Sequence, residues 1–244
     1  MATVNASKYG YGYATSELGW MTARDATTAN AVTNQPSSTN LRIVRVNYEA
    51  GGKGSEWGVY RAWFAFNVSA YSSHTISNLK LYYKPTTSTS GHSGAGLKVA
   101  IVKSTAQGNA DTDLTTSDFN NFDDTVDYAD NDGTNIWADS TSLSYFDLNS
   151  TAITAFSNSY IKLAIVEYVH DYNNSAPGFA TDWKAYNNFD TSGSGVIPYL
   201  SFTATATGWN YGDINGVTSP SDKLNAIEYT DIDRINEIGE IYPP

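Results

Sequence analysis

One segment, residues 58–68, constrains the fold of this chain more than any other part of its sequence. Alternate residues of its sequence GVYRAWFAFNV form one largely apolar face, which consists of Tyr60, Ala62, Phe64, Phe66 and Val68. The residues between them form the other face, which consists of Arg61, Trp63, Ala65 and Asn67. Apolar positions that recur with a period of two predict a β-strand that is buried on one face.

Strands are predicted at many places in the chain, whereas helical periodicity is scarce. Further predicted strands are 41–48, 76–83, 97–102, 160–169 and 196–205. Only 148–156 is expected to form a short helical turn, with Ser and Thr as its candidate caps. Strands without intervening helices favour an antiparallel sandwich or barrel over a βαβ fold. The long connections 84–96 and 105–142 are expected to be loops that serve as binding surfaces or inter-subunit arms.

The composition supports this class and excludes several functions. Aromatic residues make up 14% of the chain, which is typical of strands. The chain has no cysteine, and this excludes disulfides, cysteine-rich zinc sites and thiol catalysis. A net charge of −11 argues against direct nucleic-acid binding. No apolar run is long enough for membrane insertion. An initiating Met without a secretory signal predicts a chain that stays inside the producing cell until release.

Near the N-terminus, the segment KYGYGYA alternates tyrosine with glycine. Two interpretations are open. Residues 1–40 could be an N-terminal arm whose tyrosines pack against a neighbouring subunit, or this segment could be an edge strand of the same sandwich.

Two consecutive segments, VYRAWFAFNVSAY and ISNLKLYYKP, resemble the opening of the bacterial cell-surface jelly-roll modules known as the DNRLRE family. In those modules an aromatic strand ends in Phe-Asp-x-Ser, and here Asn67 replaces the aspartate. IKLAIVEYVHDY and IPYLSFTATA are similar to the late and closing strands of the family. The resemblance covers residues 40–207 and implies a fold rather than a function. We therefore expect an all-β, antiparallel, jelly-roll-like β-sandwich over 1–207 and a short C-terminal extension over 208–244.

The C-terminal extension contains three spaced units of one type, INGV at 214–217, LNAI at 224–227 and INEI at 235–238. A short segment with one sparse apolar stripe cannot stay folded alone in water. We expect it to bury its aliphatic side chains on its own body or on another chain. The predicted anchors of this assembly tail are Ile214, Val217, Leu224, Ile227, Ile232, Ile235 and Ile238.

The same extension is similar to the C-terminal tails of structural proteins of tailed bacteriophages, which contain repeats of the type Ile-Asn-Gly-Val. Ala226 and Glu237 stand where those repeats have glycine. The resemblance implies a non-enzymatic virion protein, such as a capsid decoration, a knob or a tail-fibre component. Such a protein is assembled in the host cytoplasm with other virion proteins, and virion symmetry favours a homo-oligomer.

Two other classes of function stay open. The main alternative is a secreted or cell-surface carbohydrate-binding module, which would be extracellular, and the third is a glycan-cleaving enzyme. We assign no catalytic residue, because the chain lacks a nucleophile elbow and its three histidines are expected to be solvated loop residues. Trp137 and Trp183 are candidate contacts for a host glycan, and their alternative role is packing in the core or between subunits.

No cofactor is expected, and calcium is the one metal considered. The acidic stretch 111–133 is either a solvated loop or a surface calcium site, since carboxylates in a flexible loop suit this ion. Its candidate ligands are Asp123, Asp124, Asp127, Asp130 and Asp132. Asp213 could begin a second calcium loop, but the twelfth position of that loop is Leu224, which cannot bind the ion.

Overall fold

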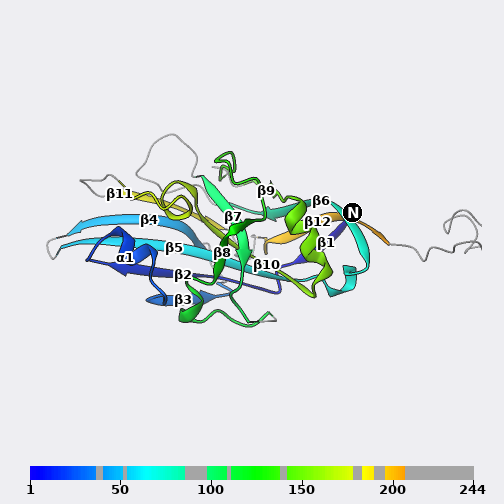
Figure 1. Cartoon of the computed structure of the whole chain (residues 1–244), viewed down its shortest axis with the longest axis horizontal. Coiled ribbons are helices and arrows are strands. Elements are labelled where there is room, and N and C mark those ends of the chain that lie inside the picture. The colour runs from blue at the N-terminus through cyan, green and yellow to red at the C-terminus, as the bar shows by residue number, and fades with distance from the viewer. Residues whose placement is uncertain are drawn as a thin grey trace, which may run out of the picture. The chain divides into compact units, whose positions relative to one another are not determined.

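The chain is an all-β sandwich, as the alternating segments predict (Figure 1). The computed structural model describes residues 1–36, 41–51, 54–85, 98–108, 111–137, 142–177, 183–189 and 196–206, with 41–51, 54–55 and 183–189 described as backbone only. Met1–Thr205 is one compact unit of two packed antiparallel sheets. The finer prediction of a jelly roll stays a prediction.

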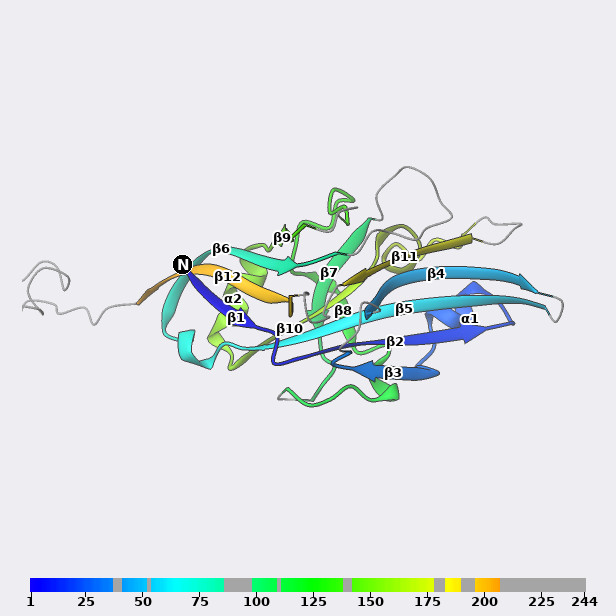
Figure 2. The ribbon, with the colours of Figure 1, turned by 180° about the vertical axis from the view of Figure 1, so that it is seen from behind.

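The smaller sheet has the strand order β1-β12-β6-β9. These strands are β1 (Ala2–Asn5), β12 (Tyr199–Ala206), β6 (His74–Tyr83) and β9 (Ser144–Asp147). The first strand and the last therefore lie side by side, with Val4 opposite Leu200 (Figure 2). Strand β9 ends this order and is an edge strand of the sheet among the described strands.

The larger sheet is organised around one long strand, β5 (Gly54–Asn67). Strand β2 (Lys8–Ser16) pairs along one edge of β5, and β3 (Ala31–Asn34) pairs with β2. The other edge of β5 is shared end to end by β4 (Leu41–Gly51) and β10 (Tyr160–Glu167). The sheet continues through the outer strands, which are β11 (Trp183–Phe189), β7 (Val99–Ser104) and β8 (Phe122–Asp127).

Strand β5 confirms the predicted alternation, but the expectation of one-sided burial is wrong. Ala62, Phe64 and Phe66 pack in the core between the two sheets. On the opposite face, Trp63 packs in a second cluster with Trp20 and Phe119, under the short helix α1 (Trp20–Arg24) and the turn η2 (Thr116–Asp118). Helix α1, which precedes β5 in the chain, and turn η2, which follows it, cover this face. Strand β5 is therefore buried on both sides.

The tyrosine–glycine segment is part of the sandwich and not an arm. Tyr9 packs in the main core, and Tyr13 stacks on Tyr60 with ring centroids 5.1 Å apart. The glycines allow close packing on the other face, because a Cβ on Gly10 would lie 2.4 Å from the carbonyl oxygen of Thr33. The edge of β2 is itself covered by β3 over Gly10–Tyr13.

Two helical turns begin where an asparagine side chain bonds to the backbone. The helical turn predicted at 148–156 is confirmed as α2 (Ser150–Thr154) followed by η3 (Ala155–Ser157). Its cap is Asn149, not the expected Ser or Thr, and Asn149 Oδ1 accepts from the N–H of Thr151 at 3.0 Å. Asn67 Oδ1 accepts from the N–H of Ser69 at 3.2 Å and from Ser69 Oγ at 2.7 Å, so this asparagine supplies the acceptor that a turn at the end of β5 requires. The turn η1 (Ser69–Tyr71) follows.

Several segments differ from the expected boundaries, and β12, for example, begins at Tyr199 rather than at residue 196. The long predicted loop 105–142 contains β8, which pairs with β7. Strand β10 ends at Glu167, and a short π-helix, η4 (Tyr168–Tyr172), follows where the sequence pattern predicted a strand up to residue 169. No helix in the described part of the chain is long and apolar enough to cross a membrane.

Candidate functional site

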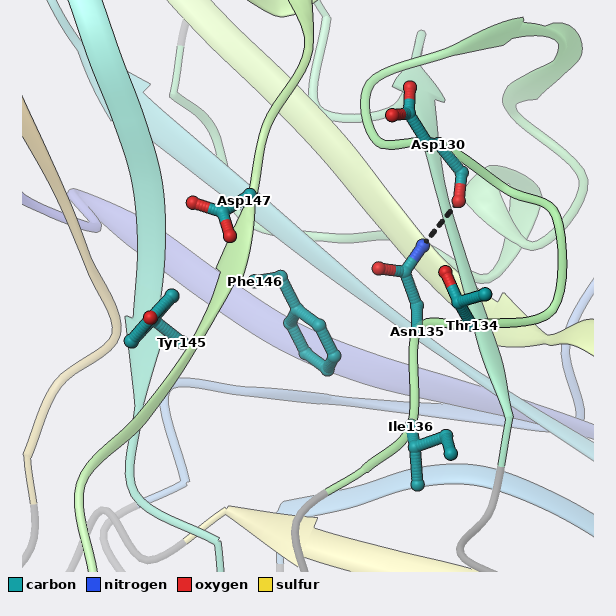
Figure 3. Close-up of a pocket in the computed structure, with 7 residues that line it drawn as sticks. All are labelled: Asp130, Thr134, Asn135, Ile136, Tyr145, Phe146 and Asp147. Atoms are coloured by element: carbon teal, nitrogen blue, oxygen red, sulfur yellow. Dashed lines mark hydrogen bonds between the residues drawn. The ribbon is translucent and has the colours of Figure 1, made fainter.

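A cleft opens between strand β9 and residues 130–136 (Figure 3). Its volume is about 370 Å³. The lining residues are Asp130, Thr134, Asn135, Ile136, Tyr145, Phe146 and Asp147. Small-molecule sites typically measure about 300–1,000 Å³. The volume of this cleft falls in that range, but its lining is mainly polar, with apolar surface from Ile136.

The first wall of the cleft is strand β9, whose side chains alternate. Phe146 is buried and points between the two walls, whereas Tyr145 and Asp147 lie on the other side of the strand (Figure 3). The N–H of Leu148 donates to the carbonyl of Leu79 at 2.9 Å. Because bonded pairs alternate in an antiparallel ladder, the backbone groups of Tyr145 and Asp147 then face away from β6, toward the cleft.

The second wall is held in shape by its own hydrogen bonds. Asn135 Nδ2 donates to the carbonyl of Asp130 at 3.0 Å (Figure 3). Thr134 Oγ1 donates to Asp132 Oδ1 at 2.6 Å, and this bond lowers the pKa of the Asp132 carboxyl. Ile136 forms a backbone bridge to Lys98, and its side chain is 52% exposed at the cleft. The wall is therefore formed before any ligand arrives.

A row of tyrosines crosses the outer face of the small sheet and ends at the cleft. Tyr199, Tyr82 and Tyr145 come from the neighbouring strands β12, β6 and β9. The rings of Tyr82 and Tyr199 are stacked 5.0 Å apart, and Tyr145, which is 47% exposed, follows at 5.3 Å from Tyr82. Burial raises the pKa of Tyr199. Lys80 pairs with Asp147 at 2.9 Å and lies over the Tyr145 ring.

A group of charged residues, which we call the Arg61 cluster, is buried on the face of the large sheet that points away from the small sheet. Arg61 and Asp171 are each 1% exposed and form a two-bond ion pair of 2.9 and 2.7 Å. The other guanidinium N–H groups donate to the carbonyls of Arg24 and Phe119 and to Asn120 Oδ1. All five donors of Arg61 are therefore used.

Glu167 holds the π-helix η4 beside the Arg61 cluster. Its carboxylate accepts from the N–H groups of Val169, His170 and Asp171 at 2.8, 2.5 and 3.1 Å. Burial raises the pKa of this carboxyl. These groups are closed off from solvent and bonded to each other, so their role is to fix α1, η2 and η4 over the sheet rather than to contact a ligand.

Tyr172 links η4 to β8 and should make stability fall at alkaline pH. Its hydroxyl donates to Asp127 at 2.9 Å, and burial, followed by this bond, raises its pKa to about 12. The folded state favours the neutral phenol, so this contribution is complete below the unfolded pKa of about 10 and is lost as pH rises through about 12. We expect urea denaturation to show a steeper loss of stability over this range for the wild type than for Tyr172→Phe. Tyr160→Phe is the control, and an unchanged slope in Tyr172→Phe would contradict the prediction.

The two tryptophans proposed as glycan contacts have different outcomes in the structure. Trp137 does not offer a sugar-stacking face, because its side chain is 1% exposed and its ring packs 4.4 Å from that of Tyr83. The alternative, packing in the core, is correct for this residue. The backbone of Trp183 begins β11, and its side chain lies outside the described residues. The seven anchors of the assembly tail also lie outside the described residues, so their role stays a prediction.

The structure does not support the calcium-site interpretation of the acidic stretch. Among the residues that the structure describes, no group of three His, Asp or Glu side chains is placed to hold a metal ion. Asp123 instead accepts from Thr125 Oγ1 at 2.6 Å, and Asp127 accepts from Asn131 at 2.8 Å. These carboxylates support local turns of β8 and the segment that follows it.

Of the residues that line the cleft, only Asp130 was a candidate site residue from the sequence, and it was considered as a calcium ligand. Ile136 was adjacent to a proposed contact, but strand-like alternation places it on the opposite side from Trp137. The short alternating run Ser144–Asp147 was the available signal for β9. Its four residues are too few for a firm prediction of a strand from periodicity.

A comparison with models of known protein families finds no match to this chain, and a comparison with curated proteins finds no similar sequence.

Proposed function

We propose that this chain is a non-enzymatic structural protein of a tailed-bacteriophage virion, in which the sandwich is displayed and the tail 208–244 attaches it to other virion proteins. The observation that carries the proposal is the repeated aliphatic–Asn unit of the tail. A short apolar stripe of this kind requires a surface on which to be buried.

The described part of the body supports a proposal in which the sandwich is displayed and a separate segment attaches it. Met1–Thr205 forms one compact unit, and the described residues of both hydrophobic clusters lie within it. The Arg61 cluster contains the most deeply buried charged groups among the described residues. These groups bond to each other and to nearby backbone. Because the body is compact by itself, we expect it to fold without the attachment segment.

The test is a chain that ends at Thr207. We expect it to fold and to melt within about 2 °C of the full chain, because a change below 1 kcal/mol shifts the melting temperature of a chain of this size by only a few degrees. It should no longer enter virions when it is produced in infected cells, as measured by mass spectrometry of purified particles. An unfolded product would show that the tail belongs to the core, and normal incorporation would show that it is not the anchor.

A full-length variant separates loss of the anchors from loss of length. Ile232, Ile235 and Ile238 are replaced together by serine, and Thr218, Ser219 and Ser221 are replaced by alanine as the matched control. The first variant should stay out of particles, and the control should enter them. Equal incorporation of both would contradict an apolar anchor.

The runner-up function, an extracellular carbohydrate-binding module, is favoured by a different observation, the cleft with its row of tyrosines. The same particle test separates the two, because a module of this kind would not enter virions with or without its tail.

A further inference from the structure

We infer that the cleft between β9 and residues 130–136 binds one neutral pyranose unit of an oligosaccharide, with the row of tyrosines as the surface along which neighbouring units lie. This goes beyond the proposed virion role, and either can fail without the other. The site differs from the predicted glycan contacts, since it uses neither Trp137 nor Trp183.

The apolar part of the cleft suits the C–H face of a sugar ring. Ile136 is half exposed at one wall and supplies most of this apolar surface, because Phe146, which points from the other wall into the space between them, is only 4% exposed (Figure 3). Both belong to fixed backbone, Ile136 through its bridge to Lys98 and Phe146 through pairing with β6. A ligand therefore meets a preformed apolar surface, which lowers the entropic cost of binding.

The polar part of the cleft offers both donors and acceptors. The Asp130 carboxylate accepts hydrogen bonds, and Asn135 has its side-chain oxygen beside an amino group already bonded to the carbonyl of Asp130. The opposite wall adds the backbone N–H and C=O groups of Tyr145 and Asp147, which face the cleft at the edge of the sheet. Groups of both kinds on two sides match a polyhydroxylated ligand, whose hydroxyls donate and accept.

The charges at the cleft favour a neutral ligand over an anionic one. Asp130 and Asp147 are among the lining residues, and the nearby Lys80 is paired with Asp147. The chain as a whole carries a charge of −11, which repels anionic glycans, phosphates and lipid head groups.

A peptide strand is a weaker candidate for the occupant. Strand addition requires an extended run of open edge, because main-chain bonds supply the affinity. Strand β9 has four residues, of which only Tyr145 and Asp147 turn their backbone groups outward, and the second wall stands opposite them. A cleft of about 370 Å³ suits a compact ring better than a continuous strand.

The experiment begins with the full chain on an array that carries neutral, sialylated and sulfated glycans and a set of linear peptides. The strongest neutral glycan is then titrated by calorimetry into the wild type and four variants. Ile136→Ala and Asp130→Asn alter an apolar and a polar position of the second wall, and both side chains are exposed. Leu18→Ala, at a side chain that is 88% exposed, and Asp25→Asn, in an exposed ion pair, are the matched controls.

We expect neutral glycans to bind, and each cleft variant to raise the dissociation constant about five- to tenfold, as for one lost hydrogen bond or apolar contact. The two controls should stay within about twofold of the wild type. Binding of sulfated or sialylated glycans alone, of peptides alone, or of nothing on the array would overturn the inference. So would neutral binding that both cleft variants leave unchanged.

Discussion

Asp171→Asn is expected to lower the free energy of unfolding by about 3–5 kcal/mol, the cost of removing one partner of a buried ion pair. The substitution keeps the shape of the side chain but leaves the Arg61 guanidinium without a countercharge at a position that is 1% exposed. The asparagine amide can accept with only one of its two terminal atoms, so one donor of Arg61 also faces an N–H group. Urea denaturation measures the change as a lower midpoint with an unchanged slope.

The matched control is Asp25→Asn, which removes the charge from the neighbouring pair between Arg24 and Asp25. Asp25 is half exposed, and exposed pairs contribute only about 0–1 kcal/mol. A loss below 1 kcal/mol in Asp171→Asn, similar to that of the control, would show that the Arg61 cluster does not hold α1 and η4 on the sheet.

Trp137→Ala is expected to lower the free energy of unfolding by about 3–5 kcal/mol, since it removes a large, fully buried side chain from the main core. The ring contacts Tyr83 and Phe146, so its loss leaves a cavity behind the floor of the cleft. Thermal and urea denaturation both report this change. A glycan contact on the surface would behave differently, because its removal would weaken binding and leave stability nearly unchanged.

The adjacent residue, Ile136, provides the control for the predicted loss of stability. Ile136→Ala should change stability by no more than about 0.5 kcal/mol, as most surface substitutions do. The two variants thus separate core packing from ligand contact at consecutive positions. A Trp137→Ala protein as stable as the wild type would contradict the burial of this ring.

The Arg61 cluster and the cleft lie on different layers of the sandwich and have different tasks. Arg61 and Asp171 are closed off by α1, η2 and η4, and every donor of Arg61 is bonded. The lining of the cleft has exposed apolar and polar groups side by side. Burial with complete bonding is typical of structural charge, whereas exposed mixed chemistry on a fixed backbone is typical of a binding surface.

Local periodicity determined much of the fold from the sequence alone. The alternation in 58–68 predicted β5 and the residues that face the small sheet, because successive side chains of a strand point to opposite sides. The helical turn after Leu148 and the turn after β5 were equally local, since each depends on an asparagine that bonds to backbone two residues away. The aliphatic units of the tail are also a property of the sequence, and their partner is still a proposal.

Only the tertiary structure decided which exposed-looking residues are buried and which are brought together. Arg61 lies on the face of β5 that period-two alternation assigned to solvent, yet residues 110 positions away supply its countercharge. The cleft likewise places Ile136 opposite a four-residue strand. Carboxylates of the acidic stretch bond within local turns and, among the described residues, do not gather at a metal site. A sequence shows which residues are neighbours along the chain. Burial and ligand geometry depend instead on contacts between distant segments, and these contacts form only when the small sheet and the helical turns have packed on the two faces of the large sheet.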